Sequence, residues 1–356
     1  MRHFKKISFL AVALSLLMAC SPENSTLSSS GSGSGSGSSS GILSKSIMIT
    51  NAGDGVNTGS LTYIDTDGEV TNDYFQAQND GGILGKDIKA ISFGSDGYDY
   101  IIVDQYIVAV DKDYIYQNTY YGDLSDPAYL LSVKGTAGYI IDWGTAAEAG
   151  ETPYITLTGI EEAPWLYVKG DYILLNTLKP EKIVQYEGSG YNKFFISHYE
   201  NSIVSVVDLE SSGEVTEITL NDNVDDLFVV GDKIALLAKG NPGLAAIQEI
   251  DVTDNSFSTK YTFATDEYPT ALVYANESYY YALNDKIYKM GINSNIPTEV
   301  LQTTFTDFTV DGNYIYGINS STTGENSTFS AYNLTTGSLL VSSEIGINAN
   351  NIYIIE

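Results

Sequence analysis

One pattern recurs along this chain at intervals of roughly 40–45 residues: a turn, a short apolar strand, a Gly, Asp or Asn turn, and a second strand rich in aromatic residues. Seven copies are present, and they begin near Asp87, Pro127, Pro180, Val224, Pro269, Asp307 and Asn350. Repeats of this length with about four strands each are typical of β-propellers. The sequence therefore predicts an all-β fold, a seven-bladed β-propeller.

The two ends of the repeat array are incomplete in complementary ways. Residues 351–355 have the pattern of an inner strand with no further strands behind it, whereas residues 46–51 and 59–75 resemble the later strands of a blade that lacks its first. Pairing of the C-terminal strand with the N-terminal blade would close the ring and remove exposed sheet edges. We therefore expect closure of this kind.

The first twenty residues have the pattern of an export signal. Arg2, Lys5 and Lys6 precede a twelve-residue apolar run at 7–18, which is too short to span a bilayer as a helix. Leu17-Met18-Ala19-Cys20 resembles a bacterial lipobox, in which the cysteine is lipidated, and Cys20 is the only cysteine of the chain. The alternative is an ordinary secretory signal that happens to contain a cysteine.

Three segments follow from this division. Residues 1–20 are expected to be a lipoprotein signal peptide, and residues 21–41, which are rich in Gly and Ser, a flexible tether. Residues 42–356 are expected to form the propeller, because no second domain boundary is visible after the tether.

The charge of the chain restricts its partners. The formal net charge is −28, and it becomes −31 once the signal is removed, because three of the 17 basic residues and none of the 45 acidic ones lie in the signal. Arg2 is the only arginine. Arginine is the preferred residue for gripping phosphate and carboxylate, so nucleic acid and other anionic ligands are disfavoured. An acidic, soluble surface suited to a salty or crowded exterior is the simpler explanation of most of this charge.

The chemical inventory argues against an enzyme. Without the signal, His198 is the only histidine, which excludes a His/Cys metal cage, and we interpret it as a surface loop residue rather than a catalytic base. No cofactor or metal site is expected, and Asp65 to Gly68 fits a hairpin turn better than a calcium loop. A hydrolase that uses two carboxylates stays open as a less favoured alternative.

Function in a propeller concentrates in the loops at one face, which join the second strand to the third and the fourth to the next blade. Reading the repeats in register places the following residues at that face: Asp54, Asn57, Asp104, Gln105, Tyr120, Tyr121, Trp143, His198, Tyr199, Asn241, Asn284 and Asn319. The longest apparent insertion runs from Trp143 to Trp165. Both tryptophans either stack on a flat, largely uncharged ligand, with the amides orienting it, or pin a long loop to the sheet.

The start of the folded part carries a more specific resemblance. Asn51, Gly53, Gly59-Ser60-Leu61, Tyr63-Ile64-Asp65, Gly68 and Val70-Thr71-Asn72 resemble the opening of surface-lipoprotein propellers of the YncE/DUF5074 type from Gram-negative bacteria. That family includes BtuG-like proteins, which capture cobalamin at the cell surface and pass it to a TonB-dependent transporter. The chain departs from the family at Asp104-Gln105 and in the third blade, both at the expected binding face.

The resemblance implies an outer-membrane lipoprotein exposed at the cell surface, held to the membrane by its lipid anchor alone. We expect a non-enzymatic protein that captures a scarce nutrient, with a corrinoid such as cobalamin as the first candidate, for a TonB-dependent transporter. The alternative is a surface adhesion or glycan-binding propeller, in which the same aromatic residues stack on sugar rings.

Overall fold

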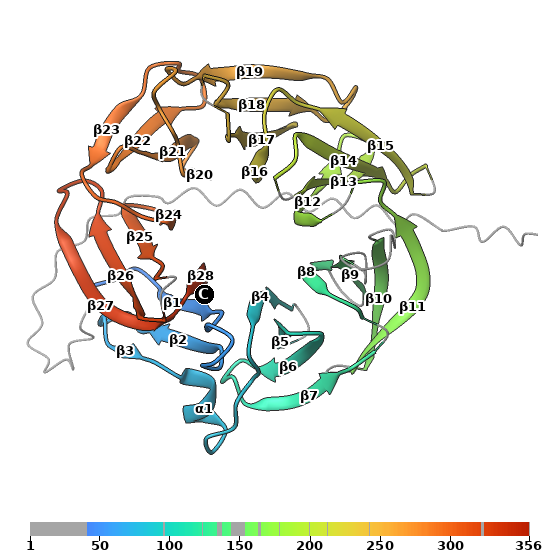
Figure 1. The fold of residues 1–356 in the computed structure, drawn as a ribbon, viewed down its shortest axis with the longest axis vertical. Helices are drawn as coiled ribbons and strands as arrows, with labels where there is room; N and C mark the ends of the chain where they lie inside the picture. The colour runs from blue at the N-terminus through green and yellow to red at the C-terminus, as the bar shows by residue number, and fades with distance from the viewer. Residues whose placement is uncertain are drawn as a thin grey trace, which may run out of the picture. The chain divides into compact units, whose positions relative to one another are not determined.

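The computed structural model describes residues 41–94, 97–122, 124–133, 137–143, 154–162, 165–177, 179–198, 200–211, 213–241, 243–321 and 324–355. In residues 41–356, seven four-stranded antiparallel sheets follow one another around a central axis as the blades of a propeller (Figure 1). The expected all-β, seven-bladed fold is confirmed.

In each blade the strands run in chain order from the inner to the outer edge, except that β28 is the inner strand of blade 1. Blade 1 contains β28 (Ala349–Ile355), β1 (Ser46–Asn51), β2 (Ser60–Ile64) and β3 (Val70–Thr71). Blade 2 contains β4 (Ile88–Phe93), β5 (Tyr98–Val103), β6 (Tyr106–Asp111) and β7 (Tyr116–Tyr120). Blade 3 contains β8 (Pro127–Val133), β9 (Ala137–Asp142), β10 (Tyr154–Glu162) and β11 (Trp165–Leu174). Blade 4 contains β12 (Pro180–Gly188), β13 (Tyr191–His198), β14 (Ile203–Asp208) and β15 (Glu214–Thr219).

The remaining three blades follow the same order. Blade 5 contains β16 (Val224–Val230), β17 (Lys233–Ala238), β18 (Ala246–Asp251) and β19 (Phe257–Thr262). Blade 6 contains β20 (Ala271–Ala275), β21 (Ser278–Leu283), β22 (Lys286–Gly291) and β23 (Thr298–Leu301). Blade 7 contains β24 (Asp307–Asp311), β25 (Tyr314–Asn319), β26 (Asn326–Asn333) and β27 (Leu339–Ile347).

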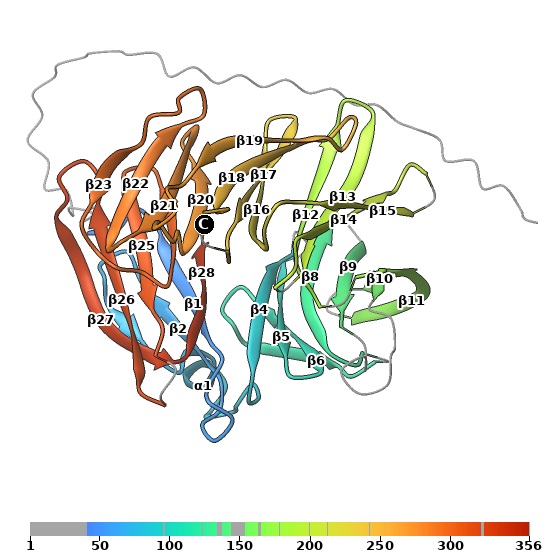
Figure 2. The same cartoon turned by 45° about the horizontal axis from the view of Figure 1, so that its top comes forward.

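The ring closes as the sequence predicts. The C-terminal strand β28 pairs antiparallel with β1, with Ile354 opposite Ile47, and so becomes the inner strand of blade 1 (Figure 2). The side chains of Asn350 and Asn351 also donate to the carbonyls of Ile88 and Lys89, each at 2.9 Å. The last strand therefore ties blade 1 both to the N-terminal strand and to blade 2.

The apolar core lies between neighbouring blades, which is why the strands alternate so regularly. Tyr279 and Tyr281 of blade 6 pack with Leu237 and Phe263 of blade 5, and at most 1% of either tyrosine is exposed. The Tyr279 hydroxyl donates to Glu249 Oε1 at 2.8 Å, so its polar end is paired where water is excluded. The run of tyrosines at this point therefore belongs to the core, as its alternation predicts.

One short helix, α1 (Tyr74–Gln78), occupies the connection from blade 1 to blade 2. The expectation that strand structure continues to residue 75 is wrong at this point, because β3 ends at Thr71 and Asp73 adopts a left-handed conformation with φ 52°. Phe75 anchors the helix in the core. In the described part of the chain, no helix is long and apolar enough to cross a membrane.

Many of the acidic residues have structural roles at turns. The residue at the end of the third strand accepts a hydrogen bond from the backbone N–H two positions later in five blades, through Asp65, Asp111, Asp208, Asp251 and Asn333. These Asx turns stabilise the hairpin to the outer strand. The turn assignment for Asp65 to Gly68 is confirmed, since Gly68 has φ 84° and its N–H donates to the Asp65 carbonyl at 3.0 Å.

Candidate ligand site in the central channel

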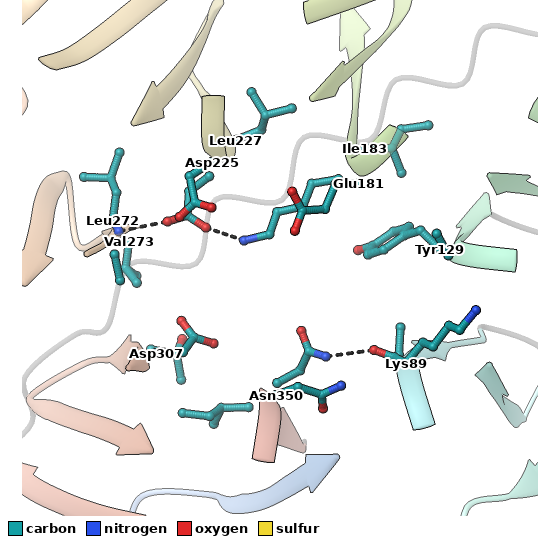
Figure 3. A pocket seen from close by; sticks show the side chains of 18 of the residues that line it. Lys89, Tyr129, Glu181, Ile183, Asp225, Leu227, Leu272, Val273, Asp307 and Asn350 are labelled. Atoms are coloured by element: carbon teal, nitrogen blue, oxygen red, sulfur yellow. Dashed lines mark hydrogen bonds and ion pairs between the residues drawn. The ribbon is translucent and has the colours of Figure 1, made fainter. Parts of the chain in front are cut away.

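The seven inner strands surround a cavity of about 870 Å³. It is lined by residues at the beginning of β4, β8, β12, β16, β20, β24 and β28, with Trp143 beside them (Figure 3). The inner strands begin at the face where the loops between second and third strands lie, because Pro127 pairs with Asp142 and Val224 with Ala238. The cavity therefore opens at the face that the sequence selects, but its walls are strands rather than loops. We call it the channel.

Backbone irregularities decide which side chains enter the channel. The pairing register shifts near the start of five inner strands, β4, β8, β12, β16 and β28. A bulge adds a residue to one strand and redirects the neighbouring side chains. At three of these shifts, charged or amide residues that are consecutive in the sequence line the channel together: Glu181-Lys182, Asp225-Asp226 and Asn350-Asn351.

An ion pair at the centre of the channel joins three blades. Lys182 of blade 4 forms a salt bridge with Asp226 of blade 5, whose other carboxylate oxygen accepts the N–H of Leu272 in blade 6 at 2.9 Å. Burial alone would lower the pKa of the Lys182 ammonium, but Asp226, Asp225 and Asp307 raise it above its ordinary value. Lys182 therefore stays charged in the channel. We call the set Lys182, Asp226 and Leu272 the charged junction.

Two further lysines reach across blades. Lys239 pairs with Asp225 at 2.6 Å and donates to the carbonyl of Thr270 at 2.6 Å, while Lys89 pairs with Asp126. All three lysines of the channel are therefore engaged by carboxylates.

Three more carboxylates face the channel without forming a salt bridge to any described lysine: Asp87, Glu181 and Asp307. Burial raises the pKa of all three above their ordinary values, and that of Asp307 to about 6, against the opposing influence of Lys182. Among the described residues, the Asp307 carboxylate accepts one hydrogen bond, from the N–H of Phe308 at 2.9 Å. The lining thus has six carboxylates for three lysines, and positive charge is what this excess would attract.

Aromatic and amide groups complete the lining. Tyr129 points its hydroxyl into the channel (Figure 3), and burial raises its pKa, so the phenol stays protonated. Tyr353 accepts the N–H of Ile91 at 2.9 Å, and the Trp143 indole donates to the carbonyl of Pro180. We call Asn350, Asn351 and Tyr353, which hold β28 to blade 2, the amide junction.

The chemistry of this lining suits binding by charge and shape. Among the described residues, no group of three or more His, Cys, Asp or Glu side chains could hold a metal ion. The cavity volume lies within the range of about 300–1,000 Å³ that is common for small-molecule sites. A ligand with polar or positively charged groups and some apolar surface would match the carboxylates, the phenols and the indole.

The backbone places the two tryptophans at opposite ends of one strand, so the expectation that they lie close together is wrong. Tyr154 pairs with Asp142 beside Trp143, whereas Trp165 pairs with Glu162 at the other end of the same strand. The nine residues of β10 between them span roughly 30 Å at about 3.3 Å per residue. Tyr154–Glu162 of the apparent insertion is therefore regular strand, and Trp143 lines the channel.

Two other candidates have structural roles. His198 is the last residue of β13 and is fully buried, with its Nε2 2.8 Å from the Ser205 hydroxyl, so the prediction of a surface loop residue is wrong. The Asp104 carboxylate accepts the N–H groups of Lys86 and Asp87, which fixes the turn before β4. Tyr199 lies outside the described residues.

The other candidates lie near the predicted face but outside the channel. Tyr121 is 74% exposed and packs against Tyr106 at 5.3 Å between ring centroids. Asn241 lines a second cavity of about 610 Å³ that shares Glu181, Asp225 and Lys239 with the channel. The remaining candidates do not line the channel: Asn57, Gln105, Tyr120, Asn284 and Asn319. Asp54 binds the backbone and side chain of Asn57, an interaction that lowers the Asp54 pKa.

The charged channel residues that were not among the predicted site residues can still be recognised in the sequence. Acidic residues and lysines stand at the start of apolar strands in KDIKA, KPEKIV, NVDDLF and TDFTV, which are copies of one position in the repeat. Charges at equivalent positions of a closed ring point to a common axis. Reading that position across all repeats would have predicted the charged channel.

Comparison with known proteins supports the fold alone. No protein-family model matches the chain, and no curated protein matches it either. A protein of Lactobacillus plantarum has a TM-score of 0.63 at 15% identity, covering 88% of this chain and 99% of its own. A protein of Bacteroides uniformis described as a candidate 6-phosphogluconolactonase has a TM-score of 0.61 at 11% identity, covering 87% and 99%.

A third similar structure is a quinonprotein alcohol dehydrogenase-like protein of Bacteroides thetaiotaomicron, with a TM-score of 0.60 at 16% identity, covering 86% of this chain and 77% of its own. Such identities establish a shared propeller architecture, and one architecture serves many functions. The class defined here is a seven-bladed β-propeller with a charged central channel.

Proposed function

We propose that this protein is a non-enzymatic binding propeller that takes a small molecule in the channel. The observation that carries the proposal is the 870 Å³ cavity at the start of the inner strands, with six carboxylates against three lysines. Because the unneutralised carboxylates repel anions, the ligand is neutral or positively charged.

A corrinoid is the first candidate for that ligand. Its amide side chains can hydrogen-bond to carboxylates and phenols, and its flat macrocycle offers a face for the Trp143 indole. The resemblance at residues 51–72 supports the same choice. In this proposal the protein is an outer-membrane lipoprotein anchored through Cys20, exposed at the cell surface, that hands its ligand to a TonB-dependent transporter.

Co-elution tests the proposal. Purified protein is mixed with cyanocobalamin and desalted, and the corrin absorbance is measured in the protein fraction. We expect about one equivalent to co-elute and Trp143→Ala to lose it at an unchanged melting temperature. Trp165→Ala is the matched control, because Trp165 pairs with Glu162 at the other end of β10. This variant should bind cyanocobalamin as the parent protein does. A colourless protein fraction would overturn the corrinoid assignment.

A carboxylate-based hydrolase is the second candidate, and Asp307 is the observation that favours it. A carboxyl with a pKa of about 6 in a cavity has the property required of a general acid. Turnover of chromogenic glycosides that disappears in Asp307→Asn would establish this activity. Absence of turnover across neutral and acidic pH would leave binding as the function.

A further inference from the structure

Lysines join blades at the end of the ring opposite the channel mouth. Lys193 of blade 4 donates to the carbonyl of Val252 in blade 5 at 2.8 Å, and Lys260 of blade 5 donates to that of Ile292 in blade 6 at 2.7 Å. Val252 and Ile292 both directly follow the third strand of their blades. In both of these junctions a lysine ammonium of one blade therefore donates a hydrogen bond to a carbonyl of the next blade, and the two carbonyls occupy equivalent positions in the repeat.

The next junction, between blades 6 and 7, is held by an amide instead of a lysine, because the Asn276 side chain of blade 6 donates to the Gly312 carbonyl of blade 7. Leu334 directly follows the third strand of blade 7, and among the described residues no lysine donates a hydrogen bond to it. Lys289 of blade 6 instead lies over the ring of Tyr280, 5.5 Å from its centroid. A cavity of about 300 Å³, lined by both Lys289 and Leu334, remains between the blades.

Lys289 is unusual in this acidic chain. It forms no salt bridge with any described carboxylate, whereas Lys286 on the same strand pairs with Glu299 at 2.6 Å. The Lys289 ammonium group has three N–H donors. The face of the Tyr280 ring attracts the positive charge but accepts no N–H···O hydrogen bond, so the donors stay available to a ligand. A carboxylate entering the cavity would therefore find a cation that has no anionic partner.

The rest of the lining is suited to hydroxyl groups. Asn276, Asn313 and Thr335 surround the cavity with amides and a hydroxyl, while Val300 and Leu334 provide apolar surface. The Asn276 amide donates to the Gly312 carbonyl at 2.7 Å, which leaves its oxygen as an acceptor. The N–H of Leu334 donates to the Asn313 carbonyl at 2.8 Å, so the two walls of blade 7 are held together.

We propose that this cavity binds an acidic sugar, with the carboxylate on Lys289 and the hydroxyls on Asn276, Asn313 and Thr335. The volume matches a single sugar ring rather than a longer chain, since it lies at the lower limit of small-molecule sites. The site shares no lining residue with the channel, and it would give the protein a contact with acidic glycans whatever the channel binds.

Titration of the purified protein with D-glucuronate, with D-glucose as the uncharged match, tests this site by calorimetry or NMR. We expect saturable glucuronate binding with a Kd on the order of 1 mM, which weakens at high salt because a charge pair is involved. Glucose should bind at least about tenfold more weakly, since it lacks the group that pairs with Lys289. Equal binding of the two sugars, or no saturable binding of glucuronate, would overturn the proposal.

Substitutions in the cavity test whether glucuronate binds there. Lys289→Met keeps the aliphatic stem over Tyr280 and removes the charge, and it should weaken glucuronate binding at least about tenfold. Lys286→Met, on the same strand but paired with Glu299, is the matched control and should bind normally. Asn313→Ala provides a second variant in case Lys289→Met does not fold. Unchanged affinity in either Lys289→Met or Asn313→Ala would contradict the assignment.

Discussion

The charged junction and the amide junction occupy the same place in the repeat, yet they are built from different chemistry. Each has its hydrogen-bond donors at a bulge that begins an inner strand, Lys182 in the first and Asn350 with Asn351 in the second. The first joins blades through ions and the second through amides on backbone carbonyls.

The difference shows that a bulge at the start of an inner strand can either close the ring or place charged groups in the channel. Amides neither titrate nor need counter-ions, so the junction that closes the ring holds under any charge state of the channel. The charged junction neutralises Asp226 with Lys182 and leaves Asp307 and Glu181 nearby without salt bridges. Closure is thereby separated from the part of the channel that we assign to the ligand.

Removing the strand that carries the amide junction should have the largest effect. Deletion of residues 349–356 takes away the inner strand of blade 1 and its contacts with blade 2. We expect a loss of more than about 5 kcal/mol in the free energy of unfolding, comparable with the stability of a whole domain. Chemical denaturation measures it, and a synthetic peptide of residues 349–356 should restore part of the stability. A deletion variant with an unchanged cooperative transition would contradict closure by β28.

Breaking the charged junction should rank second. Asp226→Ala leaves Lys182 without its salt bridge and the N–H of Leu272 without its acceptor. We expect a loss of about 2–3 kcal/mol, less than for a fully buried pair because the Lys182 side chain is 42% exposed to the channel.

Asp225→Ala is the control for Asp226→Ala. The Asp225 carboxylate, paired with Lys239, is 29% exposed against 10% for that of Asp226, so breaking this pair should cost at most about 1 kcal/mol. Urea unfolding measures the loss of free energy of unfolding in both variants. Equal losses would contradict the claim that Asp226 stabilises the fold more than Asp225 does.

Asp307→Asn should change stability in the opposite direction and only at higher pH. Because the folded-state pKa is raised to about 6, protonation of Asp307 favours the folded state, and stability falls as the pH rises from about 4 to about 6 and then levels off. The substitution removes this penalty, so we expect a gain of about 1–2 kcal/mol at pH 7.5 and none at pH 4. Thermal melts at both pH values measure it, and a destabilised variant at pH 7.5 would contradict the assignment.

The smallest change should come from a single amide. Asn351→Ala removes the hydrogen bonds from this amide to the Lys89 carbonyl at 2.9 Å and to the Thr50 hydroxyl at 3.3 Å, and we expect a loss of about 1 kcal/mol in the free energy of unfolding. The loss should be the same at pH 5 and pH 8 and at low and high salt, since no charge is involved. A strong dependence on either would show that the amide junction is coupled to the ions of the channel.

The sequence predicts the architecture well because blades are local and repeated. Each copy carries its own turns and apolar alternation, and the unmatched strands at 46–51 and 351–355 require closure. Prediction fails where a stretch of sequence is compatible with both a loop and a strand. Residues after Trp143 resemble a loop because Gly and Ala break the alternation, but Tyr154–Glu162 pairs on both sides as a strand.

The site is harder to predict because bulges are set by pairing between strands. A strictly alternating strand would place Asp225 and Asp226 on opposite faces, but both line the channel beside the shift between Val224 and Leu227. Similarly, nothing in the residues around His198 shows that β13 extends to it and buries it. Loop residues were favoured because function concentrates in loops, whereas here the inner strands provide the walls.

Binding of a pair of corrinoids that differ in charge tests the channel most directly. Aquocobalamin carries one more positive charge than cyanocobalamin, so the excess of carboxylates should make it bind about three- to tenfold more tightly at low salt. Asp307→Asn, which we expect to be at least as stable as the parent, should reduce that ratio towards one. Absence of binding for both corrinoids, or a ratio that Asp307→Asn leaves unchanged, would contradict the channel as the site of a positively charged or neutral ligand of this class.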